Sequence, residues 1–361
     1  MPGQRKKKSL AGDSEEPVSP KITAKTAPEN GDRPKLVTLA DVARRARFGE
    51  STVSRALRND GSVARASREK ILKAADDLNY VSNRIAGTLA SAKSKFIGII
   101  IPSVANTVVP EVLAGAMLVL EDAGFQPVIG VSNYDANREE KLIKSLLSWR
   151  PAGMMVAGLE HTEHARAMLM RSGVRVVELL DVDGEGIDIV VGTSHFMAGR
   201  KSAEHLLARN YRRIGYVGHD IKSDERARKR LEGFQSVLRE NGLNFLDQYF
   251  FPDCVTSVEA GKIGLACLLK RQRSLDAIYF STDQLAVGGY FYCLERNISV
   301  PTNLALFGYN GTEITRSMPQ PLSTIRTPRI AIGNIGANLL LSDGPSTVVD
   351  MGFELIVGAT S

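Results

Sequence analysis

The chain has 361 residues, 43 % of them hydrophobic and 24 % charged, a composition that allows a substantial buried core. This length accommodates one small and one large domain, or three small ones. No apolar run approaches the length of a membrane span, and the first 35 residues contain no signal-peptide core. The chain has three cysteines that are far apart in sequence and form no C-x-x-C motif, namely Cys254, Cys267 and Cys293. We therefore expect no disulfide framework and a location in the reducing cytoplasm.

The net charge of +6 is distributed unevenly along the chain. Residues 1–95 contain 20 Lys and Arg against 11 Asp and Glu, whereas residues 96–361 contain 26 against 29. This asymmetry indicates that the amino-terminal part meets phosphates through salt-sensitive contacts. Residues 1–35 almost lack large apolar side chains, so we predict a disordered basic arm that either attracts DNA weakly or is a solvated tail without function.

Residues 38–57 have the pattern of two short helices joined by a polar turn. The first helix is indicated by an apolar stripe at helical spacing, formed by Leu39, Val42, Ala43 and Ala46. Thr38 precedes it as a helix cap, with Asp41 as its capping-box partner.

The second helix, STVSRAL, directs Val53 and Leu57 inward. Its opposite face presents polar side chains, namely those of Glu50, Ser51, Ser54 and Arg55. A short helix with small polar groups beside an arginine fits the major groove of DNA. The alternative is an ordinary three-helix bundle with a solvated charged face.

This stretch resembles the headpiece of the LacI/GalR family of bacterial repressors. The segments that carry the resemblance, in the family's order and spacing, are TLADVA (38–43), TVSRAL (52–57), REKILKAADDLNY (68–80) and NRIAGTLA (83–90). The resemblance continues to about residue 353. One departure is the turn between the first two helices, where the family usually has Gly-Val-Ser and this chain has Arg47-Phe48-Gly49. We therefore expect a slightly different turn geometry.

The resemblance implies which residues contact DNA. Glu50, Ser51 and Arg55 would approach bases, because glutamate accepts from cytosine and arginine forks onto guanine. The residues implied to hold phosphates are Thr38, Thr52, Ser54 and Asn83. Residues 83–94 would form a hinge that becomes helical on the operator, with Arg84 and Ala86 at the DNA and Leu89 wedged into the minor groove. From the pattern alone, the same residues are a plain linker, because Gly87 weakens a helix.

After residue 95 the chain alternates short apolar runs with amphipathic stretches. The runs that we predict to be buried strands are 96–101, 126–131, 153–157, 174–179, 213–218, 276–281 and 304–309. The stretches that we predict to be helices are 137–149, 196–209, 224–241, 256–271 and 283–296. Such alternation indicates an α/β fold with parallel sheets flanked by helices.

The family carries a two-lobed, periplasmic-binding-protein-like core at this place. Together with the all-α helix-turn-helix headpiece, this gives four expected segments. They are an arm at 1–35, a DNA-binding domain at 36–82, a hinge at 83–94 and an effector-binding and dimerisation core at 95–361. Within the core we expect one lobe from 95–192 plus 326–344 and the other from 193–325 plus 345–361.

Polar residues at the carboxyl ends of the predicted strands are the candidates for effector contact, because ligands of parallel sheets bind there. Asp181, Asp283 and Asn310 follow predicted strands, and Arg230 lies within the predicted helix that begins near residue 224. By position in the family's motifs, the residues that fall where relatives contact the ligand are Asp181, Arg230, Thr282 and Asn310. Thr282 and Asn310 replace the Asn and Asp that sugar-binding relatives often carry. Loss of a carboxylate with retention of Arg230 favours an anionic ligand, because arginine holds a carboxylate bidentately.

Three segments resemble gluconate-operon repressors in particular: 146–156, 176–192 and 348–355. Gluconate is the expected effector, and no other cofactor is expected. A neutral sugar or a nucleoside remains the alternative effector. We expect a homodimer on a palindromic operator, paired through residues around 107–124, while the sequence leaves open whether the effector releases or promotes binding and whether the regulator represses or activates.

Other protein classes fit the sequence less well. An enzyme would need a nucleophile or phosphate motif, and G-x-S-x-G, G-x-G-x-x-G and the P-loop are missing. His161 and His164 have metal-ligand spacing but no evident third ligand, so we interpret them as a solvated helix start. The DNA-binding headpiece has no function in a secreted sugar-binding protein. The two-lobed ligand-binding core has no function in a purely architectural DNA-binding protein.

We predict that Leu89→Ala weakens operator binding far more than binding to random DNA, because a minor-groove wedge acts only where the DNA is kinked. Titrations of both DNAs at matched salt measure the two affinities. An equal loss of affinity for operator and random DNA would contradict the role of Leu89 as a minor-groove wedge.

Overall fold

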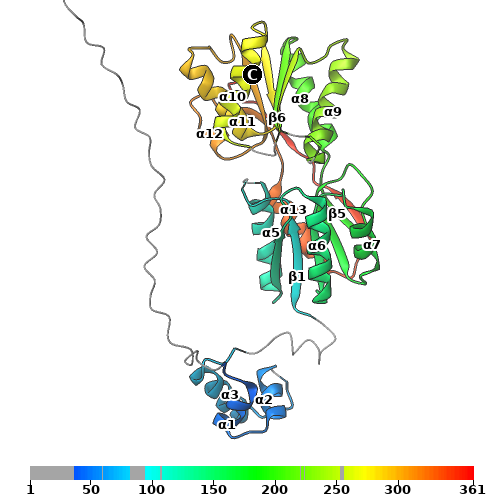
Figure 1. Ribbon diagram of the computed structural model, residues 1–361, viewed down its shortest axis with the longest axis vertical. Helices are drawn as coiled ribbons and strands as arrows, with labels where there is room; N and C mark the ends of the chain where they lie inside the picture. Colours follow the sequence, from blue (N-terminus) through cyan, green and yellow to red (C-terminus); the bar gives the residue numbers. More distant parts are fainter. Residues whose placement is uncertain are drawn as a thin grey trace, which may run out of the picture. The chain divides into compact units, whose positions relative to one another are not determined.

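The computed structural model describes residues 36–58, 60–81, 94–105, 108–219, 221–222, 224–252 and 256–361. The chain forms two compact units, Met1–Ala90 and Ser91–Ser361, shown in Figure 1. The predicted arm at 1–35 lies outside the described residues, as do the hinge residues Asn83, Arg84, Ala86 and Leu89. No helix in the described ranges is long and apolar enough to cross a bilayer.

The first unit consists of three packed helices, of which the first two are those predicted from residues 38–57. Its helices are α1 (Leu39–Ala46), α2 (Glu50–Leu57) and α3 (Arg65–Asp77). The buried side chains that hold them together are Val42, Ala43, Val53, Ala56, Val63, Ile71, Ala74 and Ala75. The capping box is present: the Thr38 backbone N–H donates to Asp41 Oδ2 at 2.9 Å, and the Thr38 hydroxyl oxygen accepts from the Asp41 backbone N–H at 3.4 Å.

The turn between α1 and α2 departs from ordinary backbone geometry at Arg47. This residue caps α1 in the left-handed conformation, with φ 60° and ψ 43°. A side chain in that region is strained by contact between Cβ and the following carbonyl, which is why glycine usually occupies it. Gly49, two residues later, has an ordinary φ of −67° at the cap of α2. The glycine therefore lies outside the position that needs it.

The second unit consists of two lobes, each with a six-stranded sheet. The first sheet has the strand order β11-β5-β4-β3-β1-β2 and is parallel throughout. Its strands are β1 (Phe96–Ile101), β2 (Gln126–Val131), β3 (Gly153–Ala157), β4 (Arg175–Asp181), β5 (Ile189–Thr193) and β11 (Thr347–Asp350).

The second sheet has the order β12-β10-β9-β8-β6-β7, and β12 alone runs antiparallel to its neighbour. Its strands are β6 (Ile214–His219), β7 (Asp247–Phe251), β8 (Ala277–Phe280), β9 (Ala305–Asn310), β10 (Ser323–Arg326) and β12 (Glu354–Ile356).

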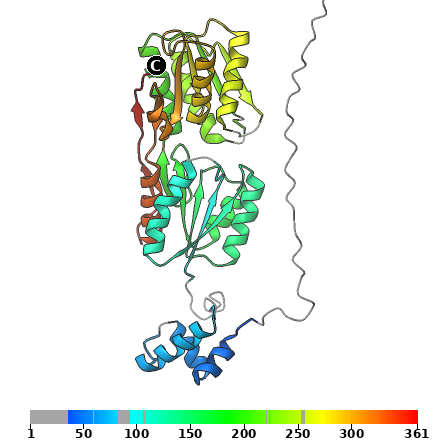
Figure 2. The same cartoon turned by 90° about the vertical axis from the view of Figure 1, so that its left-hand side faces the viewer.

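Helices cover both faces of each sheet, as Figures 1 and 2 show. In the first lobe, α5 (Val108–Asp122) and α13 (Arg329–Leu341) cover one face, and α6 (Ala136–Ser148) and α7 (Glu163–Arg171) cover the other. In the second lobe, α8 (His195–Ala208) and α9 (Glu225–Glu240) face α10 (Val258–Arg271) and α11 (Asp283–Glu295) across the sheet. A short helix, α12 (Ile314–Ser317), follows β9.

The chain passes between the lobes three times, after β5, after β10 and after β11. The predicted lobe boundary near the carboxyl end was wrong. Strand β11 pairs with β5 in the first sheet, so Thr347–Asp350 belongs to the first lobe rather than the second. Arg326 conversely ends β10 in the second sheet. The short alternating run 347–350 contains no signal for which sheet edge it will join.

All seven predicted strands and all five predicted helices of this unit are present within one or two residues of their expected bounds. The pattern missed four helices, α5, α7, α12 and α13, and five strands, β5, β7, β10, β11 and β12. These strands have only three to five residues, too few to display a hydrophobic period.

Helices α8 and α9 cross at backbone contact, which fixes the position of α9. A Cβ added at Gly199 would lie 1.9 Å from the carbonyl oxygen of Arg230, and one at Gly233 would lie 2.0 Å from that of Phe196. Only glycine permits this approach. The crossing therefore determines where the side chains around Arg230 point.

We predict that Arg47→Gly stabilises the first unit by about 1 kcal/mol, because glycine removes the left-handed strain. Native-state hydrogen exchange of the Val53 and Ile71 amides in the full chain reports this local stability. Gly49→Ser, at an ordinary φ, is the matched control and should change stability by only a few tenths of a kcal/mol. A loss of protection in Arg47→Gly would contradict the assignment of strain.

Candidate functional site: a helix-turn-helix face and an interlobe cleft

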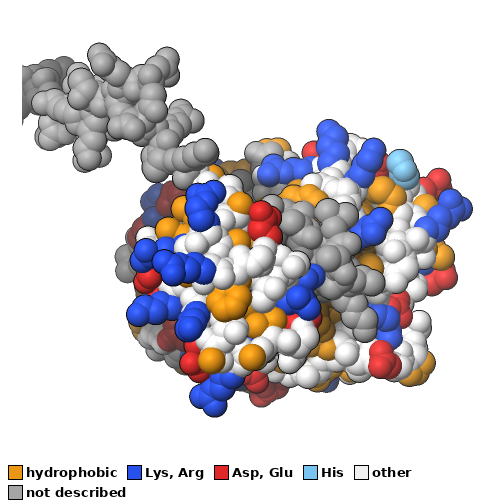
Figure 3. Space-filling model, turned by 90° about the horizontal axis from the view of Figure 1, so that it is seen from below, with side chains coloured by type: hydrophobic (Ala, Val, Ile, Leu, Met, Phe, Trp, Pro, Cys, Tyr) orange, Lys and Arg blue, Asp and Glu red, His pale blue; other side chains and the backbone are white. Residues whose placement is uncertain are grey.

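The polar face of α2 is open to solvent. Glu50, Ser51 and Arg55 are exposed, and Thr52 and Ser54 are partly so, while Val53 and Ala56 are buried. Arg55 Nε donates to the Ser51 carbonyl at 3.3 Å, so its guanidinium lies along the helix beside Ser51. Figure 3 shows one face of the molecule, on which clusters of Lys and Arg side chains lie near the outer edge of the view. The predicted DNA-contacting residues that are described thus share one accessible helix face, with Thr38 at the start of α1.

A cleft lies between the two lobes of the second unit, at the carboxyl ends of several strands. The empty volume of the cleft is about 790 Å³, which includes space open to solvent. The first lobe contributes Val108, Val109, Tyr134, Leu180, Thr193, Thr327 and Ile332. The second contributes His195, His219, Asp224, Arg226, Arg230, Thr256, Thr282, Gln284, Tyr309, Asn310 and Thr312. Of the predicted effector-binding residues, Arg230, Thr282 and Asn310 line this cleft.

Arg230 is buried and already holds several partners. Its Nη1 donates to His195 Nδ1 at 3.1 Å, its Nη2 donates to the Ser281 carbonyl at 3.4 Å, and its guanidinium lies 4.0 Å from the centre of the Tyr309 ring. Its Nε is buried and has no hydrogen-bond partner among the described residues. The Nε–H group of Arg230 is therefore without a partner in the described part of the chain and can pair with a ligand.

His195 is neutral in this environment. Its Nε2 donates to the Leu180 carbonyl at 3.0 Å, so Nδ1 is the acceptor that receives Arg230. Burial, followed by the charges of Arg230 and Arg226, lowers the pKa of His195 well below its usual value. A neutral histidine adds no positive charge to the cleft and orients the arginine beside it.

Arg226, one turn before Arg230 on α9, provides a second cation that the sequence interpretation missed. Its nearest carboxylate is Asp224, with Nε 3.8 Å from Oδ1, and its Nη1 is buried without a hydrogen-bond partner among the described residues. Asp224 in turn accepts from His219 Nε2 at 2.9 Å. Burial alone would raise the pKa of Asp224, but the His219 hydrogen bond and the charge of Arg226 hold it well below its usual value.

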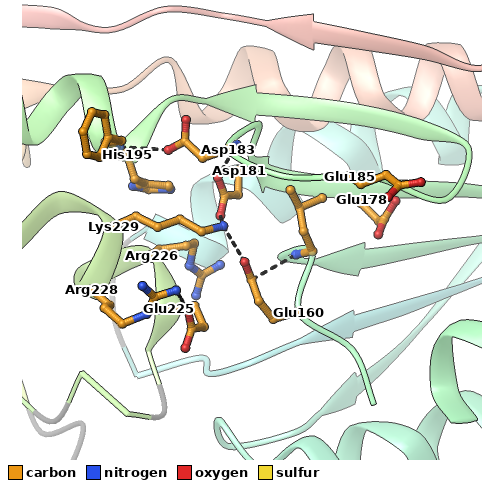
Figure 4. Close-up of polar contacts among 12 residues, drawn as sticks. Glu160, Glu178, Asp181, Asp183, Glu185, His195, Glu225, Arg226, Arg228 and Lys229 are labelled. Atoms are coloured by element: carbon orange, nitrogen blue, oxygen red, sulfur yellow. Dashed lines mark hydrogen bonds and ion pairs between the residues drawn. The ribbon is translucent and has the colours of Figure 1, made fainter. Parts of the chain in front are cut away.

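Asp181 does not line the cleft, unlike the neighbouring Leu180. Its carboxylate is fully buried and pairs with Lys229 Nζ at 2.6 Å, and Lys229 also contacts Glu160. Figure 4 shows Lys229 reaching from α9 to these two first-lobe carboxylates. Burial opposes a charged Lys229, but the hydrogen bonds that it donates to Asp181 and Glu160 raise its pKa. The pair is thus ionic and links the two lobes.

Asp283 is also buried away from the cleft and supports its wall. It accepts from the Thr312 backbone N–H at 2.7 Å and from the Thr324 hydroxyl at 2.6 Å. Burial raises its pKa, although these hydrogen bonds act in the opposite direction. Thr282 both lines the cleft and caps α11 through Leu285 N–H. Asp283 therefore holds Thr312, itself a lining residue, in place.

Three residues of the cleft wall adopt strained backbone conformations. Tyr134 has φ 60°, Leu180 has φ 81° and Asn310 has φ 123°. Such values are rare for residues with a side chain, and they cluster at ligand sites, where the surrounding structure enforces them. The Asn310 carbonyl is held by Arg329, which also pairs with Glu111 on α5. The strained wall is therefore connected to both lobes.

The sequence interpretation of His161 as part of a solvated helix start was wrong. Its side chain is 1 % exposed and lies 2.6 Å from Glu139 Oε1 and 3.3 Å from Glu178 Oε1. His164 is exposed and pairs with Glu140. Across the described residues no group of three or more potential ligands is arranged to hold a metal. His161 therefore bridges α6 and β4 as a buried ionic contact.

A helix-turn-helix unit in one chain with two α/β lobes around a cationic cleft defines a class of protein: a DNA-binding regulator with a ligand-sensing core. Comparison with family models agrees. Residues 38–83 match the model described as bacterial regulatory proteins, lacI family, and residues 203–361 match the periplasmic binding protein-like domain.

Known proteins are similar over nearly the whole chain. The HTH-type transcriptional regulator GntR of Pseudomonas aeruginosa is 38 % identical over 325 residues, covering 88 % of this chain and 94 % of the relative. GntR of Escherichia coli K12 is 34 % identical over 336 residues, covering 90 % and 99 %. A LacI-family regulator from Silicibacter pomeroyi has a solved structure with TM-score 0.86 and 42 % identity, covering 90 % of this chain and 99 % of that one.

The chain therefore belongs to the LacI family. It is a DNA-binding transcriptional regulator and not an enzyme. The family resemblance inferred from the sequence is confirmed, as is its mixed architecture of helical headpiece and two-lobed α/β core.

The buried His161 cluster predicts a pH-dependent contribution to stability. Burial alone would lower the pKa of His161, but the hydrogen bond to Glu139 and the neighbouring Glu178 carboxylate raise it to about 9 from 6.5. This stabilisation, on the order of 3 kcal/mol, is fully present below pH 6.5, declines between pH 6.5 and 9, and is lost above pH 9.

His161→Gln should remove that part of the pH dependence of the free energy of unfolding, measured by urea denaturation between pH 6 and 9.5. His164→Gln is the matched control, because His164 is exposed. Parallel pH profiles for the wild type and His161→Gln would contradict the buried ion pairs.

Proposed function

We propose that this regulator binds a palindromic operator as a homodimer and that gluconate, bound in the interlobe cleft, controls its affinity for DNA. The observation that carries the proposal is the charge of the cleft. Among the described lining residues, Arg226 and Arg230 face one carboxylate, Asp224, and each arginine has a buried N–H group without a partner in the described part of the chain. A ligand with a single carboxylate balances that charge.

The other polar residues that line the cleft suit the hydroxyl groups of a sugar acid. Hydroxyl groups need donors and acceptors of modest strength, which the cleft supplies as Asp224, Thr282, Gln284 and Asn310. Arg230 was the arginine expected to hold the carboxylate. Because Nη1 and Nη2 of Arg230 each already donate one hydrogen bond within the protein, we assign the carboxylate to Arg226 and Arg230 together.

Two further observations support gluconate over a neutral sugar. Relatives at 38 % and 34 % identity carry the name GntR, in keeping with the segments that resemble gluconate-operon repressors. The single Asp181 carboxylate that would suit a neutral sugar is neutralised by Lys229.

Pairing through the first lobe fits the exposed apolar residues of that lobe. Leu118 on α5 and Ile330 on α13 are large hydrophobic side chains exposed to solvent. A dimer engages two half-sites at once, which specific binding requires. Gluconate would act by binding one lobe arrangement more tightly than the other, since equal binding shifts nothing. As a repressor of this kind, the protein would act in the cytoplasm, where its operator lies.

The proposal predicts that gluconate raises the melting temperature of the core and that glucose, an uncharged control, does not. At a hundredfold excess over its dissociation constant a ligand stabilises by about 2.7 kcal/mol. For a core of this size that is a shift of roughly 5–10 °C. No shift with gluconate would exclude it as the effector.

In the same assay, Arg226→Ala and Arg230→Ala should abolish the gluconate shift while operator binding stays intact. Arg228→Ala on the same helix is the matched control, because Arg228 pairs with Glu225 and Glu232 and does not line the cleft. A gluconate shift that survives both arginine substitutions would place the carboxylate elsewhere.

A further inference from the structure

Three cations of helix α9, Arg226, Lys229 and Arg230, lie within about one turn of the helix and have different surroundings. Arg226 and Arg230 line the cleft, whereas Lys229 does not and instead crosses to the first lobe. Its Nζ lies 2.6 Å from Asp181 Oδ2, and its side chain is only 10 % exposed. Figure 4 shows Arg226 and Lys229 projecting from α9 toward the same side, where Asp181 and Glu160 lie.

Asp181 is poised to compete for the arginines of the cleft. It ends β4 directly after Leu180, a lining residue, and is in register with Thr193, another lining residue. The buried charge of Arg226 interacts electrostatically with both Asp181 and Glu160. Within the described chain the Asp181 carboxylate is held by Lys229 and by the Asp183 backbone N–H at 2.8 Å. Without the lysine, Arg226 is the cleft cation whose charge already interacts with Asp181.

We propose that Lys229 determines the charge selectivity of the cleft by holding Asp181 away from Arg226. It is a positioning residue: it touches no ligand and acts through the carboxylate that it neutralises. An internal carboxylate close to Arg226 would compete with the ligand carboxylate and repel it, and both effects are strong in a buried site. With Lys229 present, the Nη1 of Arg226 stays available for an anion.

This inference rests on the proposed function, since it assigns the selectivity of that cleft. It goes further in two ways. It assigns charge selectivity to Lys229, which does not line the cleft, and it predicts that Asp181→Asn compensates for Lys229→Met. A lysine with only a structural role would instead make Asp181→Asn as damaging as Lys229→Met, because either substitution alone breaks the buried pair and leaves the other partner's charge uncompensated.

The test uses the full-length protein and isothermal calorimetry with gluconate. Lys229→Met keeps the length of the side chain and removes the charge, and it should weaken gluconate binding by about tenfold or more. Asp181→Asn should bind gluconate as tightly as the wild type or more tightly. The double variant Lys229→Met/Asp181→Asn should recover to within about threefold of the wild type, since its net charge is restored.

Three controls separate selectivity from folding. Lys229→Arg retains the charge and should retain the affinity. Arg228→Met removes a neighbouring cation that does not line the cleft and should leave affinity unchanged. Lys229→Met/Glu160→Gln should recover less than the double variant with Asp181→Asn, because Glu160 is 37 % exposed and therefore partly screened by solvent.

A crystal structure of ligand-free Lys229→Met gives a readout that does not depend on gluconate. The Asp181 carboxylate should lie within hydrogen-bond distance of the Arg226 guanidinium. If it keeps its wild-type position, or if the double variant binds as weakly as Lys229→Met, the inference is overturned. If the wild type fails to bind gluconate, the proposed effector is wrong, and the position of Asp181 still decides the role of Lys229.

Discussion

Helices α8 and α9 meet at backbone contact because Gly199 and Gly233 carry no Cβ. This crossing fixes the rotation of α9 about its own axis, and with it the directions of Arg226, Lys229 and Arg230. A helix places residues four apart on one face, so the two arginines share the cleft while the lysine points to the first lobe. The electrostatics of the cleft follow from this packing.

A buried charge costs free energy unless it is paired or hydrogen-bonded. Most ionisable groups in and beside the cleft are neutral or have such a partner. His195 stays neutral, Asp224 is held as a carboxylate by His219 and Arg226, and Asp181 is neutralised by Lys229. Among the arginines and carboxylates of the described lining, an excess of one positive charge remains, because Arg226 and Arg230 face only Asp224. A monoanion is the ligand that such a site binds without leaving a buried charge unpaired, and this links the packing of α9 to the proposed sugar acid.

The fold could be predicted from the sequence to the extent that local patterns encode it. Long buried strands such as β1 and β9 and long amphipathic helices such as α9 have enough residues to show their period. Strand β11 has four residues, and its membership of the first sheet depends on pairing with β5, more than 150 positions earlier in the chain. Of the site, Arg230, Thr282 and Asn310 could be placed in the cleft by the family resemblance. The other charged or titratable lining residues Arg226, His219 and Asp224 could not be placed there.

The sequence by itself determined the class of this protein, because a helix-turn-helix and a strand–helix alternation are local patterns that a chain displays residue by residue. It also determined that the capping box of Thr38 and Asp41 would begin α1, since both partners are three residues apart. Only the tertiary structure decided which charges meet. Lys229 and Asp181 are 48 residues apart, on different lobes, and their pairing at 2.6 Å depends on how two sheets and a helix crossing are assembled. Pair electrostatics depends on distance in space, which sequence separation does not give.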